Sequence, residues 1–148
     1  MKQKMLLAAA LAALPIAAIA QTGLSPEQIV AARQAAYQLS AADFVQMKMT
    51  ADAGGDVHRL ALPARAMASW ARTLPSLFPA GTNLPSSKAL PTVWSERTGF
   101  EARAAAYAAA ATSLAEAAQA GDLALFRTRL GAVRQACADC HDHFRAPD

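Results

Sequence analysis

Residues 100–144 read FEARAAAYAAAATSLAEAAQAGDLALFRTRLGAVRQACADCHDHF. Apolar residues recur there in steps of three and four on both sides of Gly121 and Asp122, which is typical of α-helices with one apolar face. The recurring positions are Phe100, Ala104, Tyr107, Ala111, Leu114 and Ala118, then Leu123, Phe126, Leu130, Val133, Cys137, Cys140 and Phe144. Gly121 is in the position of a C′ glycine and Asp122 in that of an N-cap. The stretch therefore predicts two antiparallel helices joined by a short turn.

Two further helical stretches precede this pair. Ser25 is a typical N-cap with Pro26 at the first helical position, and the pattern continues to about Thr50 before residues 53–56 break it. The next stretch has apolar residues at heptad spacing, which are Leu60, Met67 and Leu74, with Trp70 beside them. Pro63 requires this helix to begin at the proline or to be kinked there. An irregular connection then covers residues 78–91, and the third helix follows residues 94–95.

The composition favours an all-α fold. The chain has 148 residues, of which 54% are hydrophobic but only 6% are aromatic. After residue 20 the β-branched apolar residues, which sheets favour, are only Ile29, Val30, Val45, Val57, Val93 and Val133. Charged residues make up 17% and the net charge is +3, without the basic excess of a nucleic-acid-binding protein. We therefore predict one all-α domain over residues 21–148, an antiparallel four-helix bundle.

The first 20 residues have the features of a secretory signal peptide. Lys2 and Lys4 form a positive start, an apolar stretch follows to Ile16, and residues 18–20 form a small-x-small cleavage site. The uncharged run is shorter than the roughly 20 apolar residues of a membrane-spanning helix. Cleavage removes two of the 14 Lys and Arg residues and none of the 11 Asp and Glu residues, which leaves a net charge of +1. The sequence thus predicts a soluble exported protein of a bacterial periplasm.

The chemically informative residues are Cys137, Cys140 and His141, within the sequence CADCH. On a helix, residues three and four apart lie on one face, so both thiols and the imidazole project to the same side. This is the pattern of haem c attachment: each thiol adds to one vinyl group of the porphyrin, and the adjacent histidine can then bind the iron. The spacing predicts one covalently attached haem c with His141 as its axial ligand.

Three other uses of the two cysteines are weaker. A disulfide between them would close a trivial loop and leave His141 without a role. A thiol-redox pair usually lies near a βαβ unit, which the sequence lacks. A zinc site needs about four ligands, and beyond the motif only His58, His143 and scattered carboxylates remain.

The first helix carries an interrupted apolar stripe. The stripe consists of Ile29, Arg33, Tyr37, Ser40, Phe44 and Met47. A buried arginine needs an anionic partner, and a haem propionate could supply one with suitable bidentate geometry. Two alternatives stay open: Arg33 could reach solvent from the edge of the stripe, and Tyr37 could be a plain core residue.

The whole of residues 21–148 resembles cytochrome c′, the class II c-type cytochromes. The resemblance is carried by residues 137–141 near the end of the fourth helix with Arg145 after them, and by residues 33–37, 84–94 and 117–122. It implies an antiparallel four-helix bundle with covalently attached haem c, a periplasmic location and a homodimer. It also implies a five-coordinate high-spin iron whose other face is covered by an apolar or aromatic side chain.

The resemblance further implies roles for single residues. Arg33 and Gln34 would contact the haem edge and propionates. Tyr37 would cover the distal face, and Lys88 and Ala89 would lie beside the ring.

A sixth protein ligand would change the function. Low-spin relatives use a methionine of the first helix, but Met47 and Met49 stand ten or more residues beyond Tyr37, about 15 Å along the helix axis, which is too far for the same haem. We expect Met67 to fill the core, and His58 and His143 to face solvent. The expectation is therefore an iron with a crowded but open second side.

Two functions are compatible with these expectations. The protein could exchange electrons with periplasmic redox partners, or it could bind the diatomic gases nitric oxide and carbon monoxide. Five-coordination favours gas binding, because a change of spin state and coordination slows electron transfer. The alternative is a low-spin six-coordinate cytochrome that acts purely as an electron carrier. We expect no enzymatic activity, since no distal histidine and arginine pair for cleaving an O–O bond is found.

Overall fold

A computed structural model of the chain describes residues 23–147, so the predicted signal peptide over residues 1–20 lies outside the described residues. The elements are α1 (Pro26–Asp52), the 3₁₀ turn η1 (Val57–Leu60), α2 (Ala61–Thr73), the 3₁₀ turn η2 (Leu74–Leu77), the one-turn α3 (Thr92–Ser95), α4 (Arg97–Ala120) and α5 (Leu123–Phe144). The prediction of an all-α chain with four long helices is confirmed. Within residues 23–147, no helix is both long and apolar enough to cross a membrane.

The predicted helix starts are confirmed at α1 and α5. Ser25 caps α1 in a capping box, because its hydroxyl accepts from the Gln28 backbone N–H while the Gln28 side chain accepts from the Ser25 N–H. Asp122 caps α5 by accepting from the Leu125 N–H at 2.9 Å. Gly121, which ends α4, has φ +68° in the left-handed region, as a C′ glycine should.

Pro63 lies in the first turn of a helix that begins two residues earlier, at Ala61, and not at the proline as one of the two predictions had it. The 3₁₀ turn η1 leads directly into α2, so Pro63 falls in the first turn of α2. The backbone N–H groups of a first turn have no acceptor within the helix, and a proline costs no hydrogen bond there.

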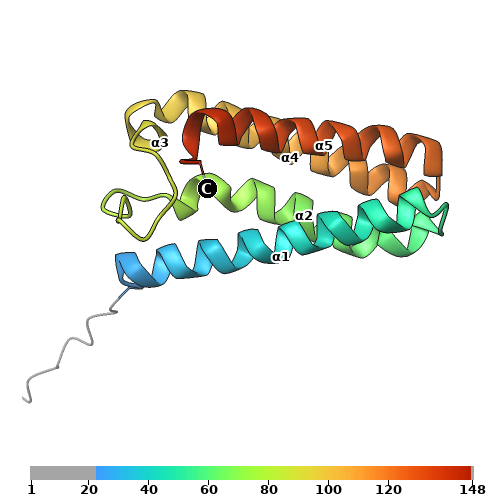
Figure 1. Cartoon of the computed structure of the whole chain (residues 1–148), viewed down its shortest axis with the longest axis horizontal. Coiled ribbons are helices and arrows are strands. Elements are labelled where there is room, and N and C mark those ends of the chain that lie inside the picture. The colour runs from blue at the N-terminus through green and yellow to red at the C-terminus, as the bar shows by residue number, and fades with distance from the viewer. Residues whose placement is uncertain (1–22, 148) are drawn as a thin grey trace, which may run out of the picture.

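The long helices form a bundle in which α1 is the most loosely packed member. Figure 1 shows α4 and α5 side by side along one edge and α1 along the opposite edge. α4 makes the most extensive contacts, with α2 and with α5, whereas α1 contacts α2 and α5 sparingly. The largest fully buried side chains include Phe126, Leu114 and Met47. Small alanines of α2 and α4, among them Ala64, Ala68, Ala111 and Ala118, are buried, and these two helices are in extensive contact.

The two glycines at the end of α4 and within α5 should respond to alanine in opposite directions. Gly121→Ala forces a left-handed φ on an L-residue and should lower the free energy of unfolding by about 1–2 kcal/mol. Its control, Gly131→Ala, lies within α5 with no atom near the added Cβ, and should raise it by about 0.5–1 kcal/mol. Urea unfolding of the haem-loaded protein measures both. Equal shifts in the same direction would contradict this reading of the turn.

Candidate haem site

The motif residues lie on the last turns of α5 and face the inside of the bundle. Cys137 and Cys140 are half-buried free thiols, and His141 is exposed, yet all three line one cavity. Burial raises the pKa of both thiols, and the positive charge of Arg103 on α4 opposes this effect at Cys140. The thiols are therefore neutral groups in an apolar wall.

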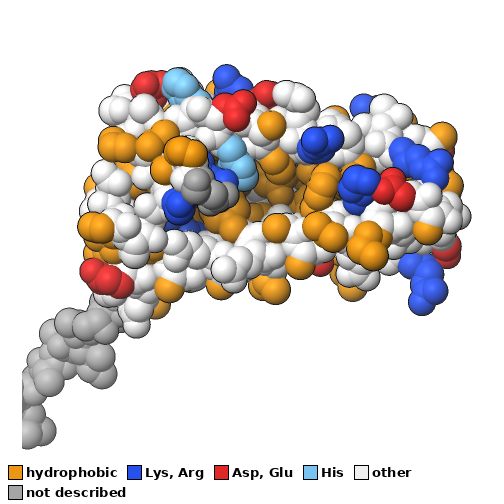
Figure 2. Space-filling model, viewed as in Figure 1, with side chains coloured by type: hydrophobic (Ala, Val, Ile, Leu, Met, Phe, Trp, Pro, Cys, Tyr) orange, Lys and Arg blue, Asp and Glu red, His pale blue; other side chains and the backbone are white. Residues whose placement is uncertain are grey.

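The cavity has a volume of about 290 Å³ and mainly apolar walls. Its lining comes from α1, α2, η2, α4 and α5, and the larger apolar members are Tyr37, Phe44, Met67, Leu74, Phe100 and Tyr107. Figure 2 shows a hollow on this face with hydrophobic side chains at its bottom and cationic and histidine side chains at its border. Apolar walls with few polar groups are typical of cofactor sites.

α1 faces this cavity with its middle turns. Arg33 and Met47 are buried, but no residue of α1 between them is, although the stripe there carries Tyr37 and Phe44. Tyr37 is half-buried and lines the cavity together with the two cysteines and His141. Burial raises its pKa, so the phenol is neutral. This face of α1 thus presents half-buried aromatic side chains to the cavity.

Arg33 does not reach solvent, which excludes one of the two alternatives left open by the sequence. It is 2% exposed, and its guanidinium donates to the Leu77 carbonyl at 3.0 Å, to both the hydroxyl and the carbonyl of Thr82 at 2.9 and 3.0 Å, and to the Ser87 hydroxyl at 2.7 Å. It also lies over the ring of Phe78, 4.2 Å from the centroid. All these acceptors are neutral, and no carboxylate of residues 23–147 forms an ion pair with it.

The other residues predicted beside the ring belong to the same loop. The Gln34 amide donates to the Ser86 carbonyl at 2.8 Å, so Arg33 and Gln34 together hold residues 77–87 on α1. Ala89 forms an antiparallel bridge with Arg145, and the Ala146 N–H donates to the Lys88 carbonyl at 2.8 Å. The loop is thereby fastened to the chain directly after the motif helix.

The predicted site residues thus fall into two groups. Tyr37 and the three motif residues meet at the cavity. The other four, Arg33, Gln34, Lys88 and Ala89, do not line it. They lie in or against the loop that follows η2, which contacts both α1 and the end of α5. Their contacts with a haem remain a prediction.

Several cavity residues were not predicted as site residues. Ser40 and Tyr107 form a polar pair in the wall, with 3.1 Å between their hydroxyl oxygens, and burial raises the pKa of Tyr107 to about 12. Ser40 and Phe44 lie one and two turns beyond Tyr37 on the predicted stripe, which could have identified them. Arg103, whose guanidinium donates to the Asp139 carbonyl at 3.1 Å, gave no signal in the sequence.

The methionines and the remaining histidines lie largely as expected. Met47 is in the core and Met49 is 68% exposed, and neither lines the cavity. His58 and His143 are exposed, and the His143 ring lies 2.7 Å from a Glu96 oxygen. Met67 is buried as expected, but it also lines the cavity.

The residues present fit a covalently attached haem c. Two thiols and one imidazole project from one helix into a cavity with apolar walls, which is the donor set and the environment that this group requires. Arg33 is a buried cation with neutral partners, so an anionic propionate would find a compensating charge on this side of the bundle.

Comparison with known proteins gives a consistent result. The family model described as Cytochrome C′ matches residues 28–145. A cytochrome c′ of Cereibacter sphaeroides is 36% identical over 97% of this chain and 97% of its own length. Among solved structures, a cytochrome c′ with ligand-controlled dimer dissociation superposes with a TM-score of 0.80, at 27% identity over 85% of this chain and all of that chain.

A second solved structure bears on the ligand. The nitric oxide complex of a variant cytochrome c′ from Alcaligenes xylosoxidans has a TM-score of 0.77, 28% identity, and covers 84% of this chain and 98% of its own. The family consists of haem proteins that are not enzymes. With the bundle, the CADCH motif on its last helix and this match over most of the chain, the protein belongs to the cytochrome c′ family.

Proposed function

We propose that this chain is a periplasmic haem c protein with a five-coordinate high-spin iron, which binds diatomic gases and exchanges electrons. The observation that carries the proposal is that Tyr37 of α1 and the Cys137, Cys140 and His141 side chains of α5 line the same apolar cavity. When bound, the haem supplies an iron that changes oxidation state and takes an axial ligand.

Each residue has a distinct task in this proposal. Cys137 and Cys140 fix the ring on α5 through two thioether bonds, and His141 is the axial ligand. Tyr37 covers the opposite side with a neutral phenol, a weak ligand, so it crowds the site without closing it. Such a site admits molecules of two atoms, and a related cytochrome c′ has been solved with nitric oxide bound.

The loop residues complete the proposed cradle. Arg33 and Gln34 would stabilise the propionates, and Lys88 and Ala89 would lie beside the ring. Support comes from the positive charge of Arg33, which has hydrogen-bonding partners but no carboxylate partner within residues 23–147.

A low-spin six-coordinate electron carrier is the second candidate. One observation favours it: Met67 of α2 is 2% exposed and lines the cavity, so its thioether is near the proposed haem. Met47 and Met49 offer no such support, because neither lines the cavity.

The spin state separates these two candidates. We expect the ferric protein to give a high-spin electron paramagnetic resonance signal and the ferrous protein to bind nitric oxide. Met67→Leu, which keeps the apolar volume but removes the sulfur, should leave both spectra unchanged. A low-spin signal that becomes high-spin in Met67→Leu would establish the six-coordinate carrier instead.

The assignment of His141 has a test of its own. His141→Ala should retain covalent haem, because both thioether bonds remain, but its absorption spectrum should change, and added imidazole should restore it. The control is His143→Ala, two positions later on an exposed side chain paired with Glu96, which should not change the spectrum. An unaltered spectrum in His141→Ala would rule out this histidine as the ligand.

The periplasmic location and the partners rest on the sequence and the family. Residues 1–20 have the pattern of a cleaved export signal, and an exported cytochrome would exchange electrons with periplasmic redox partners.

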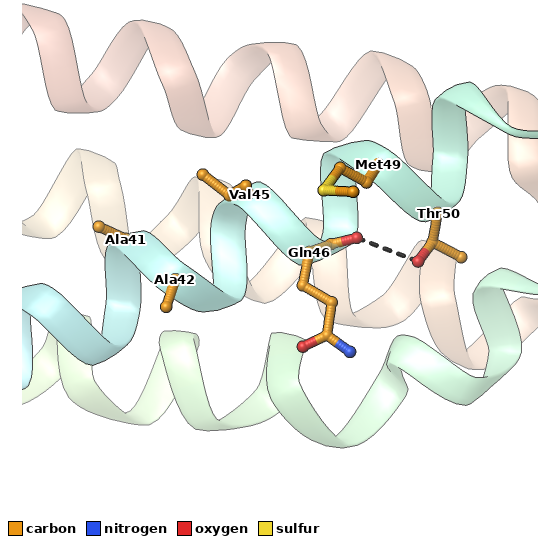
Figure 3. A pocket seen from close by; sticks show the side chains of 6 residues that line it. All are labelled: Ala41, Ala42, Val45, Gln46, Met49 and Thr50. Atoms are coloured by element: carbon orange, nitrogen blue, oxygen red, sulfur yellow. Dashed lines mark hydrogen bonds between the residues drawn. The ribbon is translucent and has the colours of Figure 1, made fainter.

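We further propose that two copies associate through α1. The outer face of α1 exposes Leu39 at 69%, Val45 at 55% and Met49 at 68%, which are three of the six large apolar side chains exposed within residues 23–147. Figure 3 shows the shallow pocket along this face, with Ala41 at one end and Thr50 at the other, where the Thr50 hydroxyl donates to the Gln46 carbonyl. A related cytochrome c′ forms a dimer that dissociates under ligand control.

The α1 face can be tested by its effect on assembly. Met49→Glu introduces a charge into the proposed interface and should shift the protein from dimer to monomer in light scattering coupled to size exclusion. Leu125→Glu on α5, at a residue that is 38% exposed, is the control and should remain dimeric. A monomeric parent protein, or a dimer unaffected by Met49→Glu, would refute association through α1.

A further inference from the structure

Trp70 lies on the side of α2 that borders the cavity. Met67 and Leu74, three residues before it and four after it, both line the cavity. Trp70 is packed against Tyr37 of α1, with ring centroids 5.4 Å apart and planes at 89°. This edge-to-face arrangement is a favourable geometry for two aromatic rings.

No hydrogen bond fixes the ring of Tyr37. Its hydroxyl has no partner within residues 23–147, whereas the hydroxyl of Tyr107, across the same cavity, is paired with Ser40. The middle turns of α1 that carry Tyr37 also contain no buried residue. The position of the Tyr37 ring therefore depends on packing, and Trp70 is its aromatic neighbour.

The indole of Trp70 is likewise held by packing of its ring and not by a hydrogen bond from Nε1. Its Nε1 is buried and has no hydrogen-bond partner in the described part of the chain. The other tryptophan, Trp94, donates from Nε1 to the Pro79 carbonyl at 3.0 Å. A buried N–H donor without an acceptor lowers the stability of the fold, so the favourable contribution of the Trp70 side chain comes from the contacts of its ring.

We propose that Trp70 is a positioning residue for Tyr37: it holds the phenol ring over the open side of the iron and thereby sets the rate at which diatomic gases enter. This inference rests on the proposed function, because it assigns Trp70 a part in controlling the same site. Trp70 acts through Tyr37 and does not itself touch the ligand, since it does not line the cavity.

The test uses carbon monoxide binding to the ferrous haem-loaded protein, followed by stopped flow. Trp70→Leu should speed association about two- to ten-fold, the range expected for losing one aromatic pair contact. Trp70→Phe keeps one aromatic ring for the contact with Tyr37 and removes the unpaired N–H together with the fused pyrrole ring, so its rate should lie closer to that of the parent than to that of Trp70→Leu. Trp94→Phe is the matched control at a tryptophan that pairs with Phe78 instead of Tyr37, and should not alter the rate.

The double variant shows whether the effect passes through Tyr37. Tyr37→Ala should speed association at least as much as Trp70→Leu, and adding Trp70→Leu to Tyr37→Ala should have no further effect. An equal acceleration in the absence of Tyr37 would overturn the inference, because Trp70 would then act on the cavity itself.

Failure of the inference and failure of the proposed function give different results. If Tyr37→Ala speeds binding and Trp70→Leu does not, Trp70 has no positioning role and the gas site stands. If Tyr37→Ala has no effect, or if no variant binds carbon monoxide, the proposed site is wrong and the inference fails with it. Chemical unfolding of the ferric proteins checks the contact without a ligand. The changes in the free energy of unfolding caused by Tyr37→Ala and Trp70→Leu should not add up to the change in the double variant, and additive changes would also overturn the inference.

Discussion

α1 is fastened to the bundle mainly at its two ends, and its middle adds only the Ser40–Tyr107 hydrogen bond and the packing of half-buried Tyr37 and Phe44. At one end, Arg33 is buried under the loop that follows α2, with four hydrogen bonds from its guanidinium. At the other, Met47 and Ala51 are buried in the core, and the Arg127 side chain of α5 donates to the Ala51 carbonyl. Between these attachments the helix faces the cavity that the α5 cysteines line. The cavity is present because both ends of α1 pack against the bundle more closely than its middle turns do.

The loop between α2 and α4 links this arrangement to the motif. It accepts hydrogen bonds from Arg33 and Gln34, and farther along it pairs with the backbone beyond α5 through Ala89 and Lys88. One irregular segment thus contacts both the first part of α1 and the end of the helix that carries His141. The haem contacts proposed for these residues and the packing of the loop use the same side chains, so the proposal implies that attachment of the cofactor and ordering of the loop would be coupled.

The helices and the motif could be predicted because their signals are local. Caps at Ser25 and Asp122 and the turn at Gly121 depend on neighbouring residues, and the spacing of Cys137, Cys140 and His141 places them on one face of any helix. The partners of Arg33 could not be predicted, because they are carbonyls and hydroxyls some fifty positions later in an irregular loop. Burial of Met67 was foreseen, but its place in the cavity wall depends on how α2 turns relative to α5, which periodicity does not specify.

The sparse packing of the middle of α1 has a consequence for how the family can diversify. No residue between Arg33 and Met47 is fully buried, although Tyr37 and Phe44 pack against the core, so exchanging the exposed residues of this stretch costs little of the cooperative stability that α2, α4 and α5 maintain. Tyr37, Ser40 and Phe44 of the same stretch line the cavity. Under the proposed function, selectivity for ligands would therefore depend on a part of the chain that contributes little to the stability of the fold, and mutation could alter the first without lowering the second.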